Sequence, residues 1–184
     1  MKKGQFGYIS SMKKKSGLAA LALAVLSVIV YMGGIRLFPE NKTAVGIFTV
    51  VFCIPAAMAL VRFIMFIRFA SGKKEIYELT EKNRGNASPF YDAIITTPDK
   101  SYGVNVFIAS GNNLIGYTEY EGADTAVIEK HLKDLYAANK FKDLNIKVFI
   151  SRDKFLLRLD SLSDRDGDPR YEDKVLHLLG RLSL

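Results

Sequence analysis

The chain has 184 residues, enough for one ordinary domain and additional segments. Hydrophobic residues make up 49% of it and concentrate in residues 17–67. The formal net charge of +7 is also unevenly spread: residues 1–74 hold eleven Lys or Arg and one acid, whereas residues 75–184 hold fifteen Lys or Arg and eighteen acids. Because the basic residues flank the hydrophobic runs, they indicate contact with lipid head groups, and a nucleic-acid partner is not expected.

Two apolar runs, at about residues 17–36 and 44–67, dominate the N-terminal part of the chain. The first run carries no charge before Arg36, and the second carries none before Arg62. A helix needs about 20 apolar residues to cross the hydrocarbon core of a bilayer. The runs therefore predict a transmembrane helical hairpin that covers residues 17–70.

Two other structures are compatible with such runs. A helical hairpin buried in a soluble protein is disfavoured, because both runs are apolar all round and lack a polar stripe. A cleaved signal peptide would use the N-terminal lysines as its basic region. However, the first run is longer than a usual signal core, and no clear small-x-small cleavage motif follows Tyr31-Met32.

The placement of Lys and Arg predicts the orientation of the hairpin. Residues 1–16 form a basic N-terminal segment with five lysines, and four more basic residues lie within residues 62–74. The connection between the runs holds only Arg36 and Lys42, with Glu40 between them. Basic residues near membrane spans favour the cytoplasmic side. We therefore predict an integral membrane protein with the bilayer as partner and with both termini and the soluble domain in the cytoplasm.

Residues 71–89 are predicted to form a juxtamembrane helix and linker. Ser71-Gly72 interrupts the apolar pattern, and Lys73 to Arg84 is typical of a short amphipathic helix. This helix either rests on anionic head groups or is the first helix of the soluble domain. Gly85 to Pro89 is a cluster of residues that break regular structure.

Residues 90–184 are predicted to form a small α+β domain with the order (α)-β-β-β-α-β-β-α. Short turns between the first three strands favour a meander, and Asp124 or Thr125 is expected to cap the helix that follows. Asp168-Pro169 is expected to start the last helix. The fold class is thus a two-helix transmembrane hairpin followed by an antiparallel sheet packed by helices. The predicted strands cover residues 90–97, 103–109, 114–120, 145–150 and 154–159, and the central helix covers residues 125–139.

No phosphate-binding loop, dinucleotide fingerprint, zinc-protease motif or nucleophile elbow is present in the sequence. The one cysteine, Cys53, lies within the second apolar run, so no intramolecular disulfide or Cys/His zinc cluster is expected. His177 is predicted to be a surface residue and His131 to be partly covered. We therefore assign no catalytic, cofactor-binding or metal-binding residue, and we expect no cofactor.

The acidic loop Asp164 to Asp168 superficially suggests calcium binding. A helix–loop–helix calcium site requires Gly at its sixth position and Glu at its twelfth. Here Gly167 is the fourth residue and Val175 the twelfth. A turn that leads into the last helix explains the loop better.

The order helix, three-stranded meander, helix and strand, over roughly residues 75–150, is similar to the core of the PD-(D/E)xK nucleases. In that family an Asp on one strand and a (D/E)-x-K motif on the next hold a divalent metal and activate water. Asp92 is the position that could match the first acid, but Asn105-Val106-Phe107 lacks the carboxylate and the lysine. The resemblance therefore implies strand order and, at most, a degenerate nuclease-like domain.

Aromatic residues gather in the predicted meander. They either form a recognition surface or cover the sheet as ordinary strand formers, and we favour the second interpretation. The residues are Phe90, Tyr91, Tyr102, Phe107, Tyr117 and Tyr120.

With no catalytic motif, the function we expect is that of a membrane-anchored, non-enzymatic interaction or assembly module. It would work through a protein partner or through self-association. The alternatives are a membrane-tethered enzyme or nuclease-like domain and a small-ligand sensor, which would require a pocket.

Overall fold

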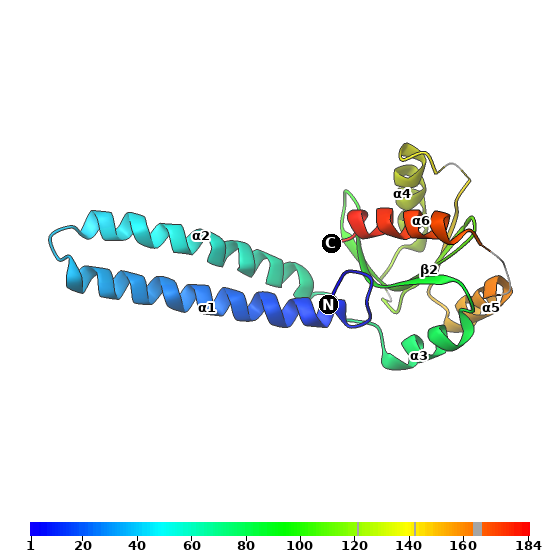
Figure 1. Cartoon of the computed structure of the whole chain (residues 1–184), viewed down its shortest axis with the longest axis horizontal. Helices are drawn as coiled ribbons and strands as arrows, with labels where there is room; N and C mark the ends of the chain where they lie inside the picture. Colours follow the sequence, from blue (N-terminus) through cyan, green and yellow to red (C-terminus); the bar gives the residue numbers. More distant parts are fainter. Residues whose placement is uncertain (121, 142, 164–166) are drawn as a thin grey trace. The chain divides into compact units, whose positions relative to one another are not determined.

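The computed structural model describes residues 1–120, 122–141, 143–163 and 167–184 (Figure 1). They form two compact units. One unit, Ile9–Ala70, is called the helical hairpin below. The other, called the α+β domain, combines Met1–Tyr8 with Ser71–Leu184. The chain thus begins in the unit in which it also ends.

The hairpin consists of two long apolar helices, α1 (Tyr8–Leu37) and α2 (Lys42–Ile67), which lie side by side and antiparallel (Figure 1). By length and composition alone each could cross a membrane. Small residues permit close contact: a Cβ on Gly34 would lie 2.6 Å from Cγ1 of Val45. Pro55 lies inside α2, where it removes one backbone donor.

The α+β domain is built on a four-stranded sheet in the order β1-β2-β3-β4. Its strands are β1 (Ser88–Thr96), β2 (Ser101–Ser110), β3 (Asn113–Tyr117) and β4 (Asn145–Phe149). The first three form the predicted antiparallel meander. β4, however, pairs parallel to β3, so the sheet is mixed and the prediction of an antiparallel sheet is wrong. The reason is the helix α4 (Thr125–Ala138) between these strands, because a helical crossover carries the chain back to the end of the sheet at which β3 began.

The strand predicted at residues 154–159 is also wrong, because these residues belong to the helix α5 (Arg152–Ser163). Phe155, Leu159 and Leu162 are fully buried, and their spacing of four and three residues is that of one helix face. In a strand Leu157 would share a face with Phe155 and Leu159, but it is 73% exposed. In the α+β domain, the order of elements after its first helix is therefore β-β-β-α-β-α-α.

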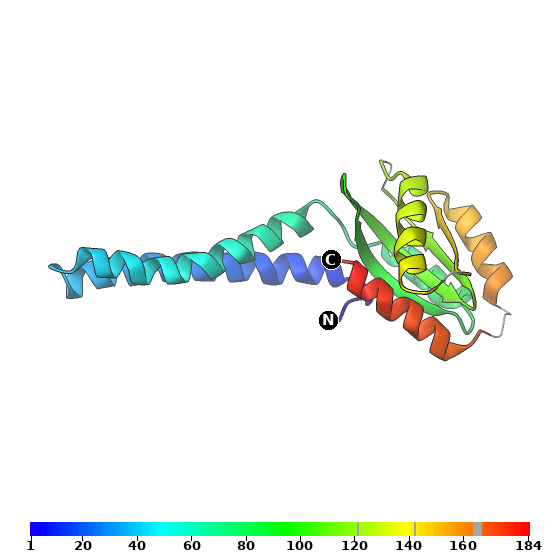
Figure 2. The same ribbon diagram turned by 90° about the horizontal axis from the view of Figure 1, so that it is seen from above.

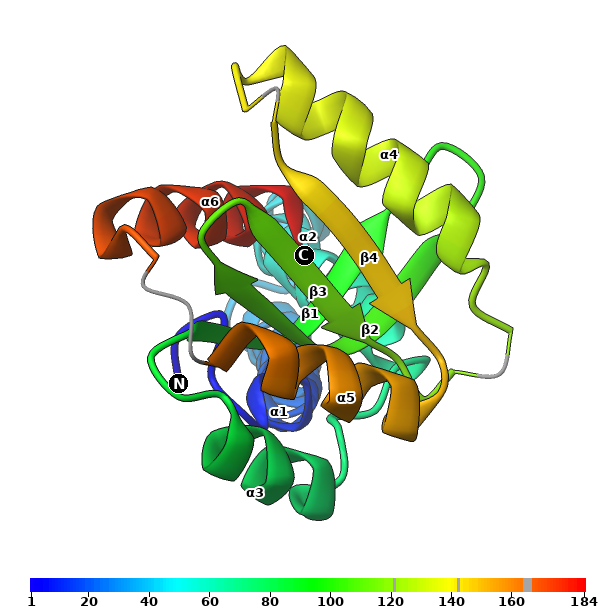
Figure 3. The same ribbon diagram turned by 90° about the vertical axis from the view of Figure 1, so that its right-hand side faces the viewer.

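Helices cover both faces of the sheet (Figure 3). α4 and α6 (Pro169–Leu182) lie over one face, which Figure 2 views directly. α3 (Lys74–Asn83) and α5 lie over the other face. α3 buries Ile76 in this second core, so it is the first helix of the domain, one of the two alternatives left open by the sequence.

The two expected helix caps are confirmed. The Asp124 carboxylate accepts a hydrogen bond from the Val127 N–H at 3.1 Å, and the Asp168 carboxylate accepts one from the Arg170 N–H at 2.9 Å. Pro169 occupies the first turn of α6, where its missing N–H removes no helical hydrogen bond.

The aromatic residues of the meander cover the sheet rather than forming an exposed surface, as the favoured interpretation holds. Five of them are 0–7% exposed, and Tyr120 is partly buried against the core on the side of α4 and α6. The five buried residues are Phe90, Tyr91, Tyr102, Phe107 and Tyr117.

Candidate functional site

Residues 1–8, called the N-terminal clasp below, lie along the outer edge of β1. The Tyr91 N–H donates to the Gly4 carbonyl oxygen at 2.9 Å, and the two residues form an antiparallel bridge. Gly4 has a φ of +84°, and a Cβ there would lie 2.7 Å from Cδ2 of Phe90. Glycine is therefore required for so close an approach.

The clasp also reaches the C-terminal end of the chain. The Lys3 ammonium donates to the Ser183 carbonyl oxygen at 2.8 Å and to the Gly180 carbonyl oxygen at 3.3 Å. These carbonyls lie at the end of α6, where unpaired acceptors and the helix dipole favour a cation. Ser183 in turn bridges to Ile95 on β1. Both chain ends thus cover an edge that would otherwise be open to pairing with other strands.

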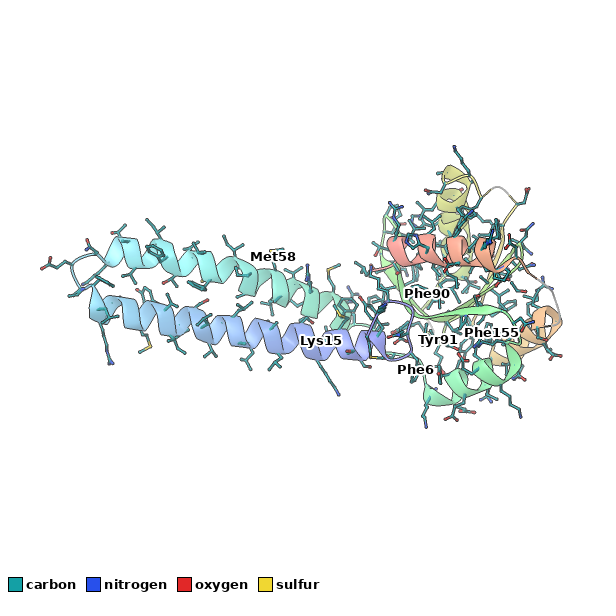
Figure 4. All side chains as sticks on the ribbon, viewed as in Figure 1. Phe6, Lys15, Met58, Phe90, Tyr91 and Phe155 are labelled. Atoms are coloured by element: carbon teal, nitrogen blue, oxygen red, sulfur yellow. The ribbon has the colours of Figure 1, made fainter. Side chains whose placement is uncertain are left out.

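An aromatic cluster holds the clasp against α3 and β1. The Phe6 ring stacks on Tyr77 with ring centroids 4.7 Å apart and meets Tyr91 edge-on at 6.4 Å. Tyr77 and Tyr91 are themselves in contact at 5.1 Å. Figure 4 labels Phe6 and Tyr91 in this cluster. A shallow cavity of about 430 Å³ lies here, lined by the three aromatic residues together with Met1, Gly4 and Gln5.

The Tyr91 hydroxyl of this cluster is part of a hydrogen-bonded group with the Glu81 carboxylate and the Arg84 guanidinium. The Tyr91 hydroxyl donates to Oε1 of Glu81 at 2.6 Å, and Nε of Arg84 donates to Oε2 at 2.8 Å. Burial, the bond to Glu81 and the charge of Glu81 raise the pKa of Tyr91. Burial acts to raise the pKa of Glu81, but the hydrogen bonds from Tyr91 and Arg84, with the charge of Arg84, outweigh it and lower that pKa.

The pKa of Tyr91 and the pKa of Glu81 are both shifted further from neutral pH. The phenol stays protonated and the carboxylate stays ionised, so neither has a pKa near the working range of a general acid or base. These residues instead hold the N-terminal clasp in place, through the backbone hydrogen bond to Gly4, the aromatic contacts of Phe6 and the contact of Lys3 with the end of α6.

Asp92, the acid singled out by the nuclease resemblance, lies within β1. It is 2% exposed, has a φ of +54°, and accepts a hydrogen bond from the Gly72 N–H at 3.1 Å. Phe90 and Ala93 face the same core although they are three residues apart, whereas residues three apart in a regular strand face opposite sides. Asp92 therefore lies where the side chains of β1 change face. Its bond to Gly72 also fixes the segment that precedes α3 against β1.

The residues opposite Asp92 supply no metal-binding chemistry. The Asn105 side-chain oxygen accepts a hydrogen bond from the Glu119 N–H at 2.7 Å, and Val106 and Phe107 are buried in the two cores. Among the described residues, no group of three or more His, Cys, Asp and Glu side chains could hold a metal ion.

The remaining candidate residues lie apart from one another. His177 is exposed on α6, and His131 is partly buried on α4. Of the acidic loop, Asp168 caps α6, while residues 164–166 lie outside the described part of the chain.

Sequence reasoning missed two features of the structure. The clasp gave no signal, because a short basic segment before an apolar run is explained by membrane topology. Glu172 is 3% exposed and accepts hydrogen bonds from the Gly111 N–H at 2.8 Å and the Ser88 hydroxyl at 3.1 Å. A signal for it was available, since Glu172 precedes Val175 by three residues and Leu179 by seven on the buried stripe of α6.

Comparison of the chain with protein-family models, curated proteins and solved structures identifies no significant match, so its function is argued from its own residues.

Proposed function

We propose that the protein is anchored in a membrane by its helical hairpin and that its α+β domain is a non-enzymatic interaction or assembly module in the cytoplasm. The observation that carries the proposal is the exposure of large apolar side chains along α1 and α2. Leu18 is 70% exposed, Phe48 68% and Ile47 66%. Contiguous apolar surface of this extent is unfavourable in water and is the surface that lipid covers.

The division of the chain into two units supports a hairpin that crosses the membrane twice. Met1–Tyr8 and Ser71–Leu184 belong to one compact unit, and the hairpin Ile9–Ala70 leaves and re-enters that unit. Both ends of the hairpin must then be on one side of the bilayer. Removal of a signal peptide would also remove the residues that pair with β1, which weighs against cleavage.

The charges support the cytoplasmic side for that unit. The basic residues cluster near the two ends of the hairpin that connect to the α+β domain, and the one acid of residues 1–74, Glu40, lies in the distal turn. Lys and Arg near a span favour the cytoplasmic face.

The structural use of two buried acids and of the half-buried Glu81 supports an interaction module over an enzyme. Glu81, Asp92 and Glu172 each accept hydrogen bonds that join elements of the fold. β4 is the sheet edge opposite β1, and a partner would contact it together with the side chains that flank it. There Glu129 accepts from the Val148 N–H at 2.9 Å and pairs with exposed Lys147.

Topology is the first test of the proposal. Reporter fusions in the turn at Asn41 should read outside and fusions at the C-terminus inside. The protein should also stay with membranes during alkaline carbonate extraction. Release by carbonate would reject the anchor, and a C-terminal fusion that reads outside would reject the cytoplasmic domain.

The second test concerns association. Chemical cross-linking in intact membranes should give one defined adduct, a homo-oligomer or a single partner complex. Leu157→Glu on the exposed face of α5, next to β4, should weaken the adduct, whereas the matched change Asp160→Lys, also exposed on α5, should not. The absence of any defined adduct would contradict a module for interaction or assembly.

The order α3-β1-β2-β3-α4-β4 with helices on both faces of the sheet favours a nuclease-like domain as the second candidate. This candidate requires divalent-metal binding. Calorimetric titration of the full chain in detergent with Mg²⁺ and Mn²⁺ tests it, and a saturable signal lost in Asp92→Asn would favour it over the interaction module.

A further inference from the structure

The hairpin holds a groove of about 400 Å³ between α1 and α2. From α1, Lys15, Ala19 and Leu23 lie along it at spacings of four residues, which place them on one helix face. From α2, Pro55, Met58 and Arg62 line it at spacings of three and four. Its volume is within the range of about 300–1,000 Å³ that is common for ligand sites.

The lining of this groove changes from basic to apolar along its length. Lys15 and Arg62 lie towards the end of the hairpin that connects to the α+β domain, and Leu23 and Pro55 lie towards the distal turn. Lys15 and Leu23 are eight residues apart, or about 12 Å along a helix. A phospholipid has the same sequence of a charged head group followed by apolar chains.

The two cations have no acidic partner nearby. Among residues 9–70, all of which are described, the one acid is Glu40 in the distal turn. Neither Lys15 nor Arg62 forms an ion pair among the described residues, and both are exposed. An anion from outside the hairpin is therefore the available counter-charge.

A second groove in the hairpin provides an internal comparison. It has a volume of about 530 Å³ and is lined by apolar residues such as Ala20, Ala24, Leu60 and Phe63, with no charged residue among those that line it. Acyl chains can fill it without regard to the head group. Of these two grooves, the one lined by Lys15 and Arg62 is the one that carries positive charge.

We propose that the groove binds one anionic phospholipid from the leaflet that faces the α+β domain. Its phosphate lies between Lys15 and Arg62, where the guanidinium donates paired hydrogen bonds and the ammonium supplies a point charge. One acyl chain follows Ala19, Leu23 and Met58, and the flexible Met58 side chain adapts to its path. Basic pockets between membrane helices at the cytoplasmic surface are typical sites for anionic head groups. This inference rests on the proposed insertion of the hairpin into a bilayer.

The test uses the full chain in nanodiscs of phosphatidylcholine with a minor fraction of phosphatidylglycerol. Native mass spectrometry after release into detergent measures the phosphatidylglycerol that stays bound. The double variant Lys15→Gln with Arg62→Gln should lose retention by roughly tenfold to thirtyfold, because it removes both charge-assisted contacts to the phosphate. Lys13→Gln with Lys14→Gln removes the same charge outside the groove and should change retention by less than about twofold.

Equal retention of the two lipids by the unchanged chain would overturn the proposal, as would equal losses in both double variants. A change of oligomeric state in the groove variant, without a change in lipid retention, would identify a second copy of the hairpin as the occupant and overturn it too. Carbonate extraction distinguishes failure of the proposed membrane anchor from failure of the proposed lipid site. Release from membranes rejects the anchor itself, whereas a chain that stays in membranes without lipid selectivity rejects the lipid site alone.

Discussion

The Lys3 ammonium donates to the Ser183 carbonyl oxygen at 2.8 Å across 180 residues of sequence. This contact joins the two ends of the chain at the edge of β1 and stabilises the end of α6. It makes the first residues a structural part of the α+β domain, and the stability of the domain should therefore respond to changes in them.

Lys3→Ala should lower the free energy of unfolding of the α+β domain by about 0.5–1 kcal/mol, because it removes a cation that binds the last carbonyls of α6. Lys2→Ala is the matched control, since Lys2 is also exposed and its backbone N–H, not its side chain, bonds to Gln5. Urea unfolding of the full chain in detergent measures both. Equal effects of the two substitutions would show that charge alone, and not the contact with Ser183, is responsible.

Gly4→Ala should detach the clasp, because the new Cβ would meet the Phe90 ring at 2.7 Å on a backbone with φ +84°. Hydrogen exchange at the Tyr91 amide, which donates to Gly4, should become faster. Gly7→Ala introduces similar backbone strain at φ +83° but places its Cβ 3.2 Å from the flexible end of Met1. Exchange at Tyr91 should therefore change less in that control, and equally fast exchange in both would attribute the effect to strain.

Glu81→Gln should change how stability depends on pH. The folded pKa of Glu81 is lowered, so the ionised carboxylate stabilises the fold above the ordinary value of 4.5, and this contribution is lost as the pH falls through the folded pKa. The difference in unfolding free energy between the unchanged chain and the variant should be constant near neutral pH and should shrink below about 4.5. Glu78→Gln, on the exposed side of α3, is the control and should have little effect. A difference that grows on acidification would contradict the assigned direction.

Phe155→Ala should destabilise the domain by about 3–5 kcal/mol, because the ring is fully buried between α5 and the sheet. Leu157→Ala should change stability by no more than about 0.5 kcal/mol, because that side chain is 73% exposed. Thermal unfolding of the two variants distinguishes a helix from a strand at residues 154–159. In a strand the two side chains would share a face, and the two losses would be similar.

Asp92→Ala should cost about 1–3 kcal/mol, because it removes the acceptor for the Gly72 N–H and places a residue without a polar side chain at φ +54°. Asp92→Asn keeps an acceptor and tolerates this backbone region, so its cost should be below about 1 kcal/mol. Denaturant unfolding measures both. Mg²⁺ should leave the unfolding midpoint of the unchanged chain unmoved, and a metal-dependent rise abolished in Asp92→Asn would show that the carboxylate binds metal.

The sequence was most informative where a pattern extends over many residues. The apolar runs are far longer than any turn of helix, and the caps Asp124 and Asp168 stand next to strongly periodic segments, so these elements were predictable. The meander was predictable for a similar reason, because short polar turns separate segments rich in β-formers.

The helix α5 was missed because its apolar residues satisfy two periods at once. Phe155, Leu157 and Leu159 alternate as in a strand, whereas Phe155, Leu159 and Leu162 follow a helix. The deciding residue, Leu162, lies beyond the short window in which the alternation was observed. The parallel pairing of β4 was missed because the antiparallel arrangement of the meander, which its short turns predict, was extended to a strand that the helix α4 separates from β3.

The clasp and Asp92 depend on contacts that no local pattern encodes. Gly4 meets Tyr91 across 87 positions of sequence, and neither residue belongs to a motif. Asp92 was noticed as a carboxylate in a strand, a position that suggests chemistry. Its role in the fold became visible through the positive φ and the bond to Gly72, which are three-dimensional properties.

The clasp also imposes an order on the biogenesis of the protein. Residues 1–8 are synthesised first, but the strand that receives them is not complete until Thr96 has left the ribosome, after both helices of the hairpin. The first segment must therefore wait through the synthesis of the whole hairpin before it can pair. In the proposed membrane topology, a chain in which only one of the two helices crossed the bilayer would have residues 1–8 and β1 on opposite sides, and its β1 edge would lack the Gly4 pairing that covers it.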